Sequence, residues 1–266
     1  MNMTFYHSKE GVSEYIKMAD GYDGRELVAV LNESLDANAT VLEIGMGPGV
    51  DLDLLSARFV VTGSDYSQLF LDRYRSVHPD ADLIQLDAIT IETDRVFDAI
   101  YSNKVLHHLE DAELLQSVHR QHNILHPHGL VLHSFWYGDW SEEHAGMQFY
   151  YRDEKFLSTT FSQCFEILQL ERYTEMEEND SIFILAASVR SSILGAVRQI
   201  TRITQTGDNV FAGGQFFINC SYPKRCVSRQ VFPCKLQAFG TGNNHNHVNL
   251  PRNAAFQQSL VGQHHR

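Results

Sequence analysis

Short apolar segments alternate with amphipathic ones over the first 189 residues, and this alternation limits the fold more than any other feature. The apolar segments predict strands, because each is short, rich in β-formers and bounded by turn residues. The amphipathic segments have apolar residues at helical spacing, as Leu27, Val30 and Leu31 show. The predicted strands are 41–44, 60–63, 83–86, 97–101 and 130–135, with helices at 24–35, from 52, and at 67–77 and 112–125. The pattern therefore predicts an α/β chain with a doubly wound sheet and helices between its first five strands.

The end of this region departs from the alternation. A helix is predicted at 152–160, and two strands follow at 165–173 and 182–189. Only a short connection containing MEENDS separates these strands, so we expect them to pair antiparallel as a hairpin. The prediction is a seven-stranded sheet that is mostly parallel and ends in an antiparallel hairpin strand.

Beyond Val189 the alternation stops. The sequence becomes rich in Gln, Asn, Ser and Gly, includes the run GNNHNHVNLPRN, and shows no sustained hydrophobic period. We predict one domain over 1–189 and a basic, polar, disordered extension over 190–266. Three of the four cysteines lie in this extension without the close C-x2-C spacing of common zinc sites, so no metal site is predicted.

Charge is divided unequally between these two regions. Residues 1–189 have 12 Lys and Arg against 32 Asp and Glu, whereas residues 190–266 have 9 against 1. An acidic domain disfavours nucleic acid as a partner, because clustered phosphates need cations to replace their counterions. The sequence contains no run of about 18 apolar residues, so no membrane span is predicted. The polar N-terminus lacks the charged and apolar regions of a secretory signal. We therefore expect a cytoplasmic protein.

The segment 41–49, VLEIGMGPG, joins the first strand to a glycine-rich turn. Glycines between a strand and a helix let the backbone approach a ligand where helical N–H groups converge. The dinucleotide fingerprint G-x-G-x-x-G would need a third glycine where Val50 stands, and Pro48 removes an amide donor. NAD(P) and FAD are therefore disfavoured. Glu43 ends the strand and is suited to a cationic amino group rather than a phosphate.

An ordered series of motifs over residues 13–189 resembles the class I S-adenosylmethionine (SAM)-dependent methyltransferase family, which has a Rossmann-like, seven-stranded sheet. The series comprises VLEIGMGPG at 41–49, VTGSDYS around Asp65, LDA at 86–88, FDAIYSNKVLHHL at 97–109 and LHPHGLVLHSFW at 125–136. The resemblance implies an enzyme that takes SAM as methyl donor and releases S-adenosylhomocysteine (SAH).

The resemblance also implies roles for single residues. Asp65 would accept hydrogen bonds from both ribose hydroxyls, and Asp87 would contact the adenine amino group. The remaining cofactor contacts are Glu43, Gly45, Gly47 and Gly49 at the methionine portion, Asn103 at the methionine end, Ala88 at the adenine ring, and Tyr66 on the ribose or adenine. Three of these have simpler readings: Asp65 as a solvated turn aspartate, Asp87 as a strand-end cap and Tyr66 as a core residue.

Methyl transfer from a sulfonium needs mainly in-line alignment, so a base is required only if the acceptor must lose a proton. His107 and His108 follow the fourth strand and are the candidate catalytic bases, with the start of a helix as the alternative reading. His133, inside the fifth strand, is predicted to be an interior histidine.

Aromatic residues gather where an acceptor pocket is expected: Phe135, Trp136, Tyr137, Trp140, Phe149, Tyr150 and Tyr151, with Tyr15 and Tyr22 from the N-terminal segment. Such a cluster suits an apolar, planar or cationic small molecule. The leading prediction is a small-molecule methyltransferase. The alternatives are a protein or RNA acceptor, a SAM-binding sensor or scaffold without turnover, and a nucleotide-dependent oxidoreductase.

Overall fold

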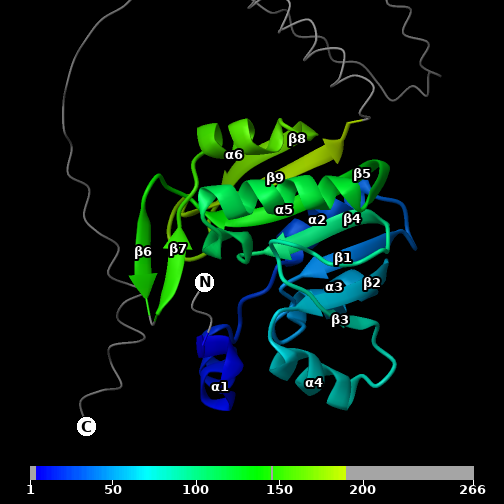
Figure 1. Ribbon diagram of the computed structural model, residues 1–266, viewed down its shortest axis with the longest axis vertical. Helices are drawn as coiled ribbons and strands as arrows, with labels where there is room; N and C mark the ends of the chain where they lie inside the picture. Colours follow the sequence, from blue (N-terminus) through cyan, green and yellow to red (C-terminus); the bar gives the residue numbers. More distant parts are fainter. Residues whose placement is uncertain (1–3, 145, 190–266) are drawn as a thin grey trace, which may run out of the picture. The chain divides into compact units, whose positions relative to one another are not determined.

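The computed structural model describes residues 4–144 and 146–189, so the predicted extension at 190–266 lies outside the described residues. A seven-stranded sheet forms the centre of the described chain, with strand order β3-β2-β1-β4-β5-β9-β8 (Figure 1). The strands are β1 (Thr40–Ile44), β2 (Val60–Asp65), β3 (Leu83–Gln85), β4 (Phe97–Asn103), β5 (Leu125–Trp136), β8 (Phe165–Tyr173) and β9 (Ser181–Ser188). The predicted doubly wound, Rossmann-like α/β fold is confirmed.

The first five strands pair in parallel, and β9 pairs antiparallel with both β5 and β8. This arrangement confirms the mostly parallel sheet with an antiparallel hairpin at its end. The strand order reverses at β1, because β2 lies on one side of it and β4 on the other. In open α/β sheets such a switch point opens a crevice at the carboxyl ends of the strands.

Helices cover both faces of the sheet. The helices are α2 (Arg25–Ser34), α3 (Val50–Ser56), α4 (Gln68–Val77), α5 (Asp111–Asn123) and α6 (Glu154–Phe161). Leu31 of α2 and Leu55 of α3 pack on one face with Tyr101. Val118 of α5 and Phe161 of α6 pack on the other face in a second core cluster. Figure 1 shows α5 in front of the strands and α2 behind them.

The connection between β3 and β4 corrects the prediction, because no helix lies between these two strands. Side chains of α5 hold this connection instead. The Ser117 hydroxyl donates to the Ala88 carbonyl at 2.6 Å, and Arg120 donates to the carbonyls of Ile91 and Thr93. Buried carbonyls need partners, and here a neighbouring helix supplies those that a crossover helix would otherwise supply internally.

Two further parts were not predicted. The N-terminal segment forms η1 (Thr4–His7) and α1 (Lys9–Met18), and β6 (Ser141–His144) pairs antiparallel with β7 (Met147–Tyr150). Ser8 caps α1 by accepting the Gly11 N–H at 2.9 Å, but few apolar residues mark this helix in the sequence. The polar sequence SEEH likewise hides β6. Figure 1 shows the β6–β7 hairpin standing apart from the main sheet. In the described residues, no helix is long and apolar enough to cross a membrane.

Candidate functional site

A pocket opens at the carboxyl ends of β1 and β2, beside the switch point of the sheet. It continues along the segment after β3 and the segment after β4. Its lining residues are Tyr6, Tyr15, Ile44, Gly45, Gly47, Asp65, Tyr66, Phe70, Leu86, Asp87, Ala88, Ile89, Lys104, Val105, His108 and Leu109. Eight residues singled out in the sequence are brought together here: Tyr15, Gly45, Gly47, Asp65, Tyr66, Asp87, Ala88 and His108. Glu43, Gly49, Asn103 and His107 do not line it.

The glycine turn requires glycine for two separate reasons. Gly45, Gly47 and Gly49 all have φ in the left-handed region, at 71°, 49° and 90°. Side chains are also excluded by close neighbours, since a Cβ on Gly49 would lie 2.2 Å from the Tyr74 ring. A Cβ on Gly45 would lie 2.5 Å from Val105. Backbone conformation therefore favours glycine at all three positions, and close neighbours exclude a side chain at Gly45 and Gly49.

Asp65 organises the turn from the end of β2. One carboxylate oxygen accepts the Gly47 N–H at 2.9 Å, and the other accepts the Ser67 N–H at 2.8 Å. Burial raises the pKa of Asp65 to about 6, against the opposing effect of these backbone donors. Ser67 stands at the N-cap position of α4, but its hydroxyl donates to the Tyr6 carbonyl instead of capping the helix.

Asp87 and Ala88 form the pocket wall after β3. One Asp87 oxygen accepts the Ile89 N–H at 2.6 Å, which fixes the carboxylate and leaves its second oxygen available to a ligand. Tyr66 also lines the pocket and is 39% exposed, so the structure does not place it in the core. Its ring contacts that of His7, with centroids 5.2 Å apart.

Glu43 lies behind the glycine turn and is 3% exposed. Within the described chain its Oε2 has no hydrogen-bond partner. Burial raises the pKa of Glu43 well above its usual value, and the carboxylates of Asp51 and Asp65 raise it further. A cationic group near this carboxyl would lower the pKa of Glu43 again, because an opposite charge favours the ionised form.

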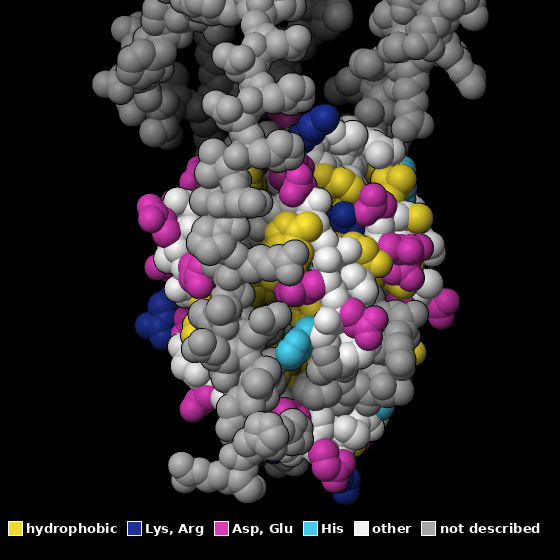
Figure 2. Space-filling view, turned by 90° about the vertical axis from the view of Figure 1, so that its left-hand side faces the viewer, with side chains coloured by type: hydrophobic (Ala, Val, Ile, Leu, Met, Phe, Trp, Pro, Cys, Tyr) yellow, Lys and Arg dark blue, Asp and Glu magenta, His cyan; other side chains and the backbone are white. Residues whose placement is uncertain are grey.

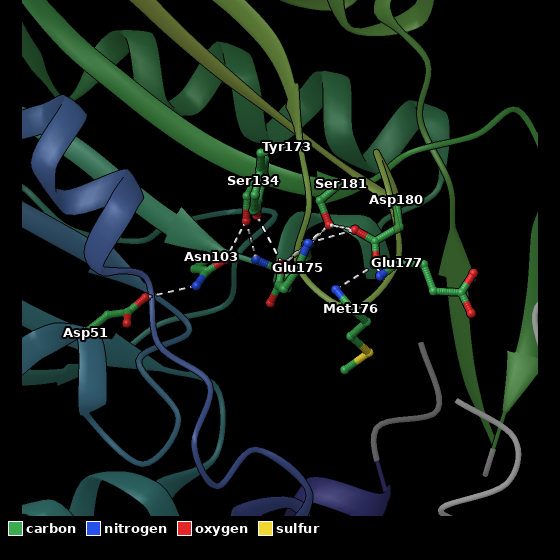
Figure 3. A network of polar contacts seen from close by, with 10 residues as sticks. Asp51, Asn103, Ser134, Tyr173, Glu175, Met176, Glu177, Asp180 and Ser181 are labelled. Carbon is green, nitrogen blue, oxygen red and sulfur yellow. Dashed lines mark hydrogen bonds and ion pairs between the residues drawn. The ribbon is translucent and has the colours of Figure 1, made fainter. Parts of the chain in front are cut away.

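Asp51 is a buried residue of this region that the sequence analysis missed. Its carboxylate accepts three hydrogen bonds, from the Gly24 N–H, the Tyr101 hydroxyl and the Asn103 amide nitrogen. Asn103 in turn accepts a hydrogen bond from the Ser134 hydroxyl (Figure 3). Both ends of the Asn103 side chain are therefore held inside the protein. One feature of the sequence could have indicated Asp51: it is an acidic residue two positions after the last glycine of the turn, in the first turn of α3.

Lys104 is a second missed residue, and it follows Asn103 with φ of 53°. Its ammonium group donates to Glu175 at 2.5 Å and to Ser181 at 2.7 Å, and it lies 3.7 Å from the centre of the Trp136 ring. Figure 3 shows how Glu175 and Ser181 come from the β8–β9 connection and its end. Burial lowers the pKa of Lys104, while Glu175 opposes that shift.

Two tyrosines of the N-terminal segment complete the pocket. Tyr6 from η1 and Tyr15 from α1 line it, with their rings in edge contact at 5.5 Å. Both rings also contact Phe70 of α4. Burial raises the pKa of Tyr15 to about 12, so its hydroxyl stays protonated at neutral pH. The expectation that Tyr15 joins the site agrees with this placement, whereas Tyr22 is 45% exposed.

His107 and His108 lie in the short 3-10 helix η2 (Leu106–His108) and contact each other. The Gln148 carbonyl can only accept, so the His108 Nδ1–H donates to it at 2.8 Å. Burial lowers the pKa of both rings, which makes them neutral at pH 7. The His108 Nε2 then accepts from the His107 Nε2–H at 3.1 Å. Only His108 lines the pocket, and the catalytic role of the pair stays a prediction.

The aromatic residues expected around an acceptor are divided among several places. Phe149 of β7 packs on both histidines, with centroids 5.2 Å and 4.7 Å from them. Phe135 belongs to the core. Trp140 stacks on Tyr151 at 3.7 Å, away from the histidines' contacts. Of the residues predicted from β5 onward, Phe149 and Trp136 are therefore placed against residues of the pocket wall, His108 and Lys104.

The surface of the described chain is strongly acidic. Figure 2 shows Asp and Glu side chains spread over the visible face, with few Lys and Arg among them. In the part of the chain that the structure describes, no group of three or more His, Cys, Asp or Glu is arranged to hold a metal ion.

Comparison with known proteins shows which families and structures this chain resembles. A family model described as a methyltransferase domain matches residues 41–129. An uncharacterized methyltransferase of Oceanobacillus iheyensis is 31% identical over 122 residues, which are 45% of this chain and 55% of that protein. The chain thus spans about half the length of this curated relative.

Solved structures share the fold at low sequence identity. A SAM-dependent methyltransferase from Clostridium acetobutylicum has a TM-score of 0.56 and 12% identity, covering 67% of this chain and 99% of that one. The N-methyltransferase NodS from Bradyrhizobium japonicum, in complex with SAH, has a TM-score of 0.55 and 16% identity, covering 69% and 100%. The 1,6-didemethyltoxoflavin-N1-methyltransferase of Burkholderia thailandensis has a TM-score of 0.57 and 18% identity, covering 67% and 87%.

The seven-stranded sheet with a pocket at its switch point is the fold that these solved methyltransferases share. Within it, residues 41–129 match the methyltransferase-domain family.

Proposed function

We propose that this protein binds SAM in the pocket at the switch point and transfers its methyl group to a small organic molecule. One observation carries the proposal above the others. The Asp65 carboxylate is anchored by backbone donors of two elements, lines the pocket, and is set opposite a glycine turn without side chains. A fixed carboxylate beside open backbone suits a ribose diol joined to an amino-acid chain.

The remaining contacts follow the shape of that cofactor. Asp87 and Ala88 would bind adenine, and Tyr66 would pack on the nucleoside. The glycine turn and Glu43 would hold the methionine portion. Its ammonium group would pair with the buried Glu43 carboxyl, whose Oε2 has no hydrogen-bond partner in the described chain. Asn103 would act at the methionine end mainly through its backbone, because Ser134 and Asp51 already engage its side chain.

SAM supplies an electrophilic methyl group when bound, so the chain's own residues need mainly to bind, align and shield the reactants. The N-terminal tyrosines Tyr6 and Tyr15 form one wall that excludes water. His108 presents a neutral ring beside Tyr6, with the ring centroids 6.3 Å apart, and the Gln148 carbonyl holds this ring. If the acceptor must lose a proton, His108 could take it only after its hydrogen bond with His107 breaks, because both His108 nitrogens are engaged.

Three observations support a small acceptor. The pocket wall is partly aromatic, the domain surface is acidic and disfavours nucleic acid, and the connection from β5 to α6 holds one small hairpin. Solved structures with this fold include two N-methyltransferases, NodS and the glycopeptide N-methyltransferase MtfA, and an amino pentose methyltransferase from Micromonospora echinaspora. An amine nitrogen is therefore the first acceptor class to test.

The test is a transfer assay with the full chain and SAM carrying a labelled methyl group. A cell extract is separated into small-molecule, protein and RNA fractions, and each is read by mass gain. The proposal expects label in small molecules, lost in Asp65→Ala. Label in protein or RNA alone would overturn the small-molecule acceptor. SAM binding with no transfer in any fraction would support a sensor or scaffold.

A further inference from the structure

A chain of fully buried polar side chains runs from the middle of the sheet to the pocket wall after β3. Its members are Ser102 on β4, His133 on β5, and Gln121 and Ser117 on α5, each with 0% exposure. Ser102 and His133 are direct partners in the β4–β5 ladder. Gln121 and Ser117 are four residues apart on α5 and therefore share one face of that helix.

The direction of every hydrogen bond follows from the end of the chain. The Ala88 carbonyl can only accept, so the Ser117 hydroxyl must donate to it at 2.6 Å. Ser117 then accepts from the Gln121 amide nitrogen at 3.1 Å. This contact turns the Gln121 carbonyl oxygen toward His133.

The same reasoning determines which ring nitrogen of His133 carries the proton. The Gln121 oxygen accepts from the His133 Nε2–H at 2.7 Å. Burial lowers the pKa of His133 to about 3, so the ring is neutral and carries one proton. Its Nδ1 is consequently an acceptor, and the Ser102 hydroxyl donates to it at 2.8 Å. All four bonds point the same way, an arrangement in which neighbouring bonds polarise one another.

The chain of bonds continues into the pocket through one peptide group. The Ala88–Ile89 peptide is held at its carbonyl by Ser117 and at its N–H by the Asp87 carboxylate, at 2.6 Å. Rotation of this peptide is therefore blocked at both ends. Fixing it also fixes which Asp87 oxygen faces the pocket. The segment needs such support, because the described residues between β3 and β4 form no helix and Ile91 has a φ of 42°.

We propose that Ser117, Gln121 and His133 are positioning residues that orient Asp87 and Ala88 and thereby set the selectivity of the pocket for adenine. This inference rests on the proposed function, because it takes Asp87 and Ala88 as the adenine contacts. A neutral, fully buried relay keeps this orientation constant across the physiological pH range. None of its three side chains touches the cofactor.

The test measures two ligands by calorimetry: SAH, and its 6-oxo analogue S-inosylhomocysteine, in which the adenine amino group is a carbonyl. Wild type should prefer SAH. Ser117→Ala should raise the Kd for SAH about tenfold, as expected for one lost buried hydrogen bond, and should bring the two Kd values closer together. Asp87→Asn serves as the reference for complete loss of this preference.

Matched variants separate positioning from general loss of stability. The Ser188 hydroxyl also donates to a backbone carbonyl, that of His126, and Ser188 is buried on β9. Ser188→Ala should therefore lower Tm while leaving both Kd values within twofold of wild type. His133→Gln keeps a donor toward Gln121 and should retain the preference for SAH, whereas His133→Leu should lose it.

The outcomes are distinguishable. If wild type binds neither ligand, the proposed function fails. If wild type prefers SAH and Ser117→Ala retains the same preference, the relay does not position the adenine contacts and this inference is wrong. An equal loss of affinity for both ligands in Ser117→Ala would also overturn it, because that is the signature of a purely structural role.

Discussion

The two ends of the pocket differ in how the chain builds them. At the end beside β2 and β3, Asp65 ends β2 and Asp87 lies two residues after β3. Each carboxylate accepts the backbone N–H two residues further along the chain, and Gly47 and Ser117 of α5 add support from farther away. At the end beside β4, Lys104 and His108 depend on partners 71 and 40 residues away, Glu175 and Gln148. The first end is therefore held largely by donors close in sequence, whereas the second requires the β8–β9 connection and the β6–β7 hairpin to be in place.

Because the two ends are held by different partners, we expect them to vary independently. The proposed function assigns the β2–β3 end to SAM and the β4 end to the acceptor. Substitutions at the first end should therefore change cofactor affinity, and substitutions at the second should change acceptor kinetics.

The largest effect is expected from Asp65→Ala. Loss of charge-assisted bonds to two ribose hydroxyls, each worth about 1.5–3 kcal/mol, should raise the Kd for SAH at least about 100-fold by calorimetry. Asp72→Ala, at an exposed position on α4, should leave the Kd unchanged. A Kd for Asp65→Ala within threefold of wild type would remove Asp65 from the site.

The next-largest effect is expected from Gly24→Ala, a substitution beside the buried side chains of Asp51 and Tyr101. A Cβ on Gly24 would lie 2.2 Å from the Tyr101 hydroxyl oxygen and 2.4 Å from Asp51. Gly24→Ala should therefore reduce the free energy of unfolding by about 2–4 kcal/mol in urea titrations, through overpacking and broken buried hydrogen bonds. Gly146→Ala is the control, since nothing lies within 4 Å of its Cβ and only backbone strain of about 1 kcal/mol is expected. Equal losses in both variants would show that the Asp51 contacts are not rigid.

A smaller effect is expected at the β4 end. Phe149→Leu alters the ring that packs on His107 and His108, so it should raise the acceptor KM about threefold to tenfold in the transfer assay. The Kd for SAH should stay within twofold. Trp140→Leu, whose ring stacks on Tyr151 instead, should change neither quantity. A change in SAH affinity without a change in KM would contradict the division between the ends.

The smallest effect is a pH dependence of cofactor binding. Asp65 has a pKa raised to about 6 by burial, and the ionised carboxylate is the form that accepts two ribose hydroxyls. Affinity for SAH should thus be constant above pH 7 and fall as pH drops through 6, approaching about tenfold per pH unit below it. Asp65→Asn should remove this dependence. A wild-type Kd that is flat from pH 5 to 8 would assign the binding to another group.

The sequence predicted the sheet well, because strand patterns are local. Apolar runs mark the strands that lead to Asp65 and Asp87, both of which line the pocket, and positive φ explains each glycine of the turn. The roles of these residues toward SAM stay predictions. The helix expected between β3 and β4 was wrong, because Ser117 and Arg120 of α5 satisfy that connection from a distance.

The parts that sequence did not predict share a different cause. Asp51 and Lys104 have no motif of their own, and their roles arise from partners that only the folded sheet brings near, such as Gly24 and Glu175. The β6–β7 hairpin has one polar strand, so its sequence resembles a loop. The predicted domain boundary at 189 and the extension beyond it stay predictions.

We propose that the pocket at the switch point is a SAM site rather than a dinucleotide site. Calorimetric titration of the full chain with SAH and, separately, with NADH distinguishes these two kinds of site. We expect SAH to bind with one molecule per chain and NADH to give no binding heat. Binding of NADH without binding of SAH would contradict the claim.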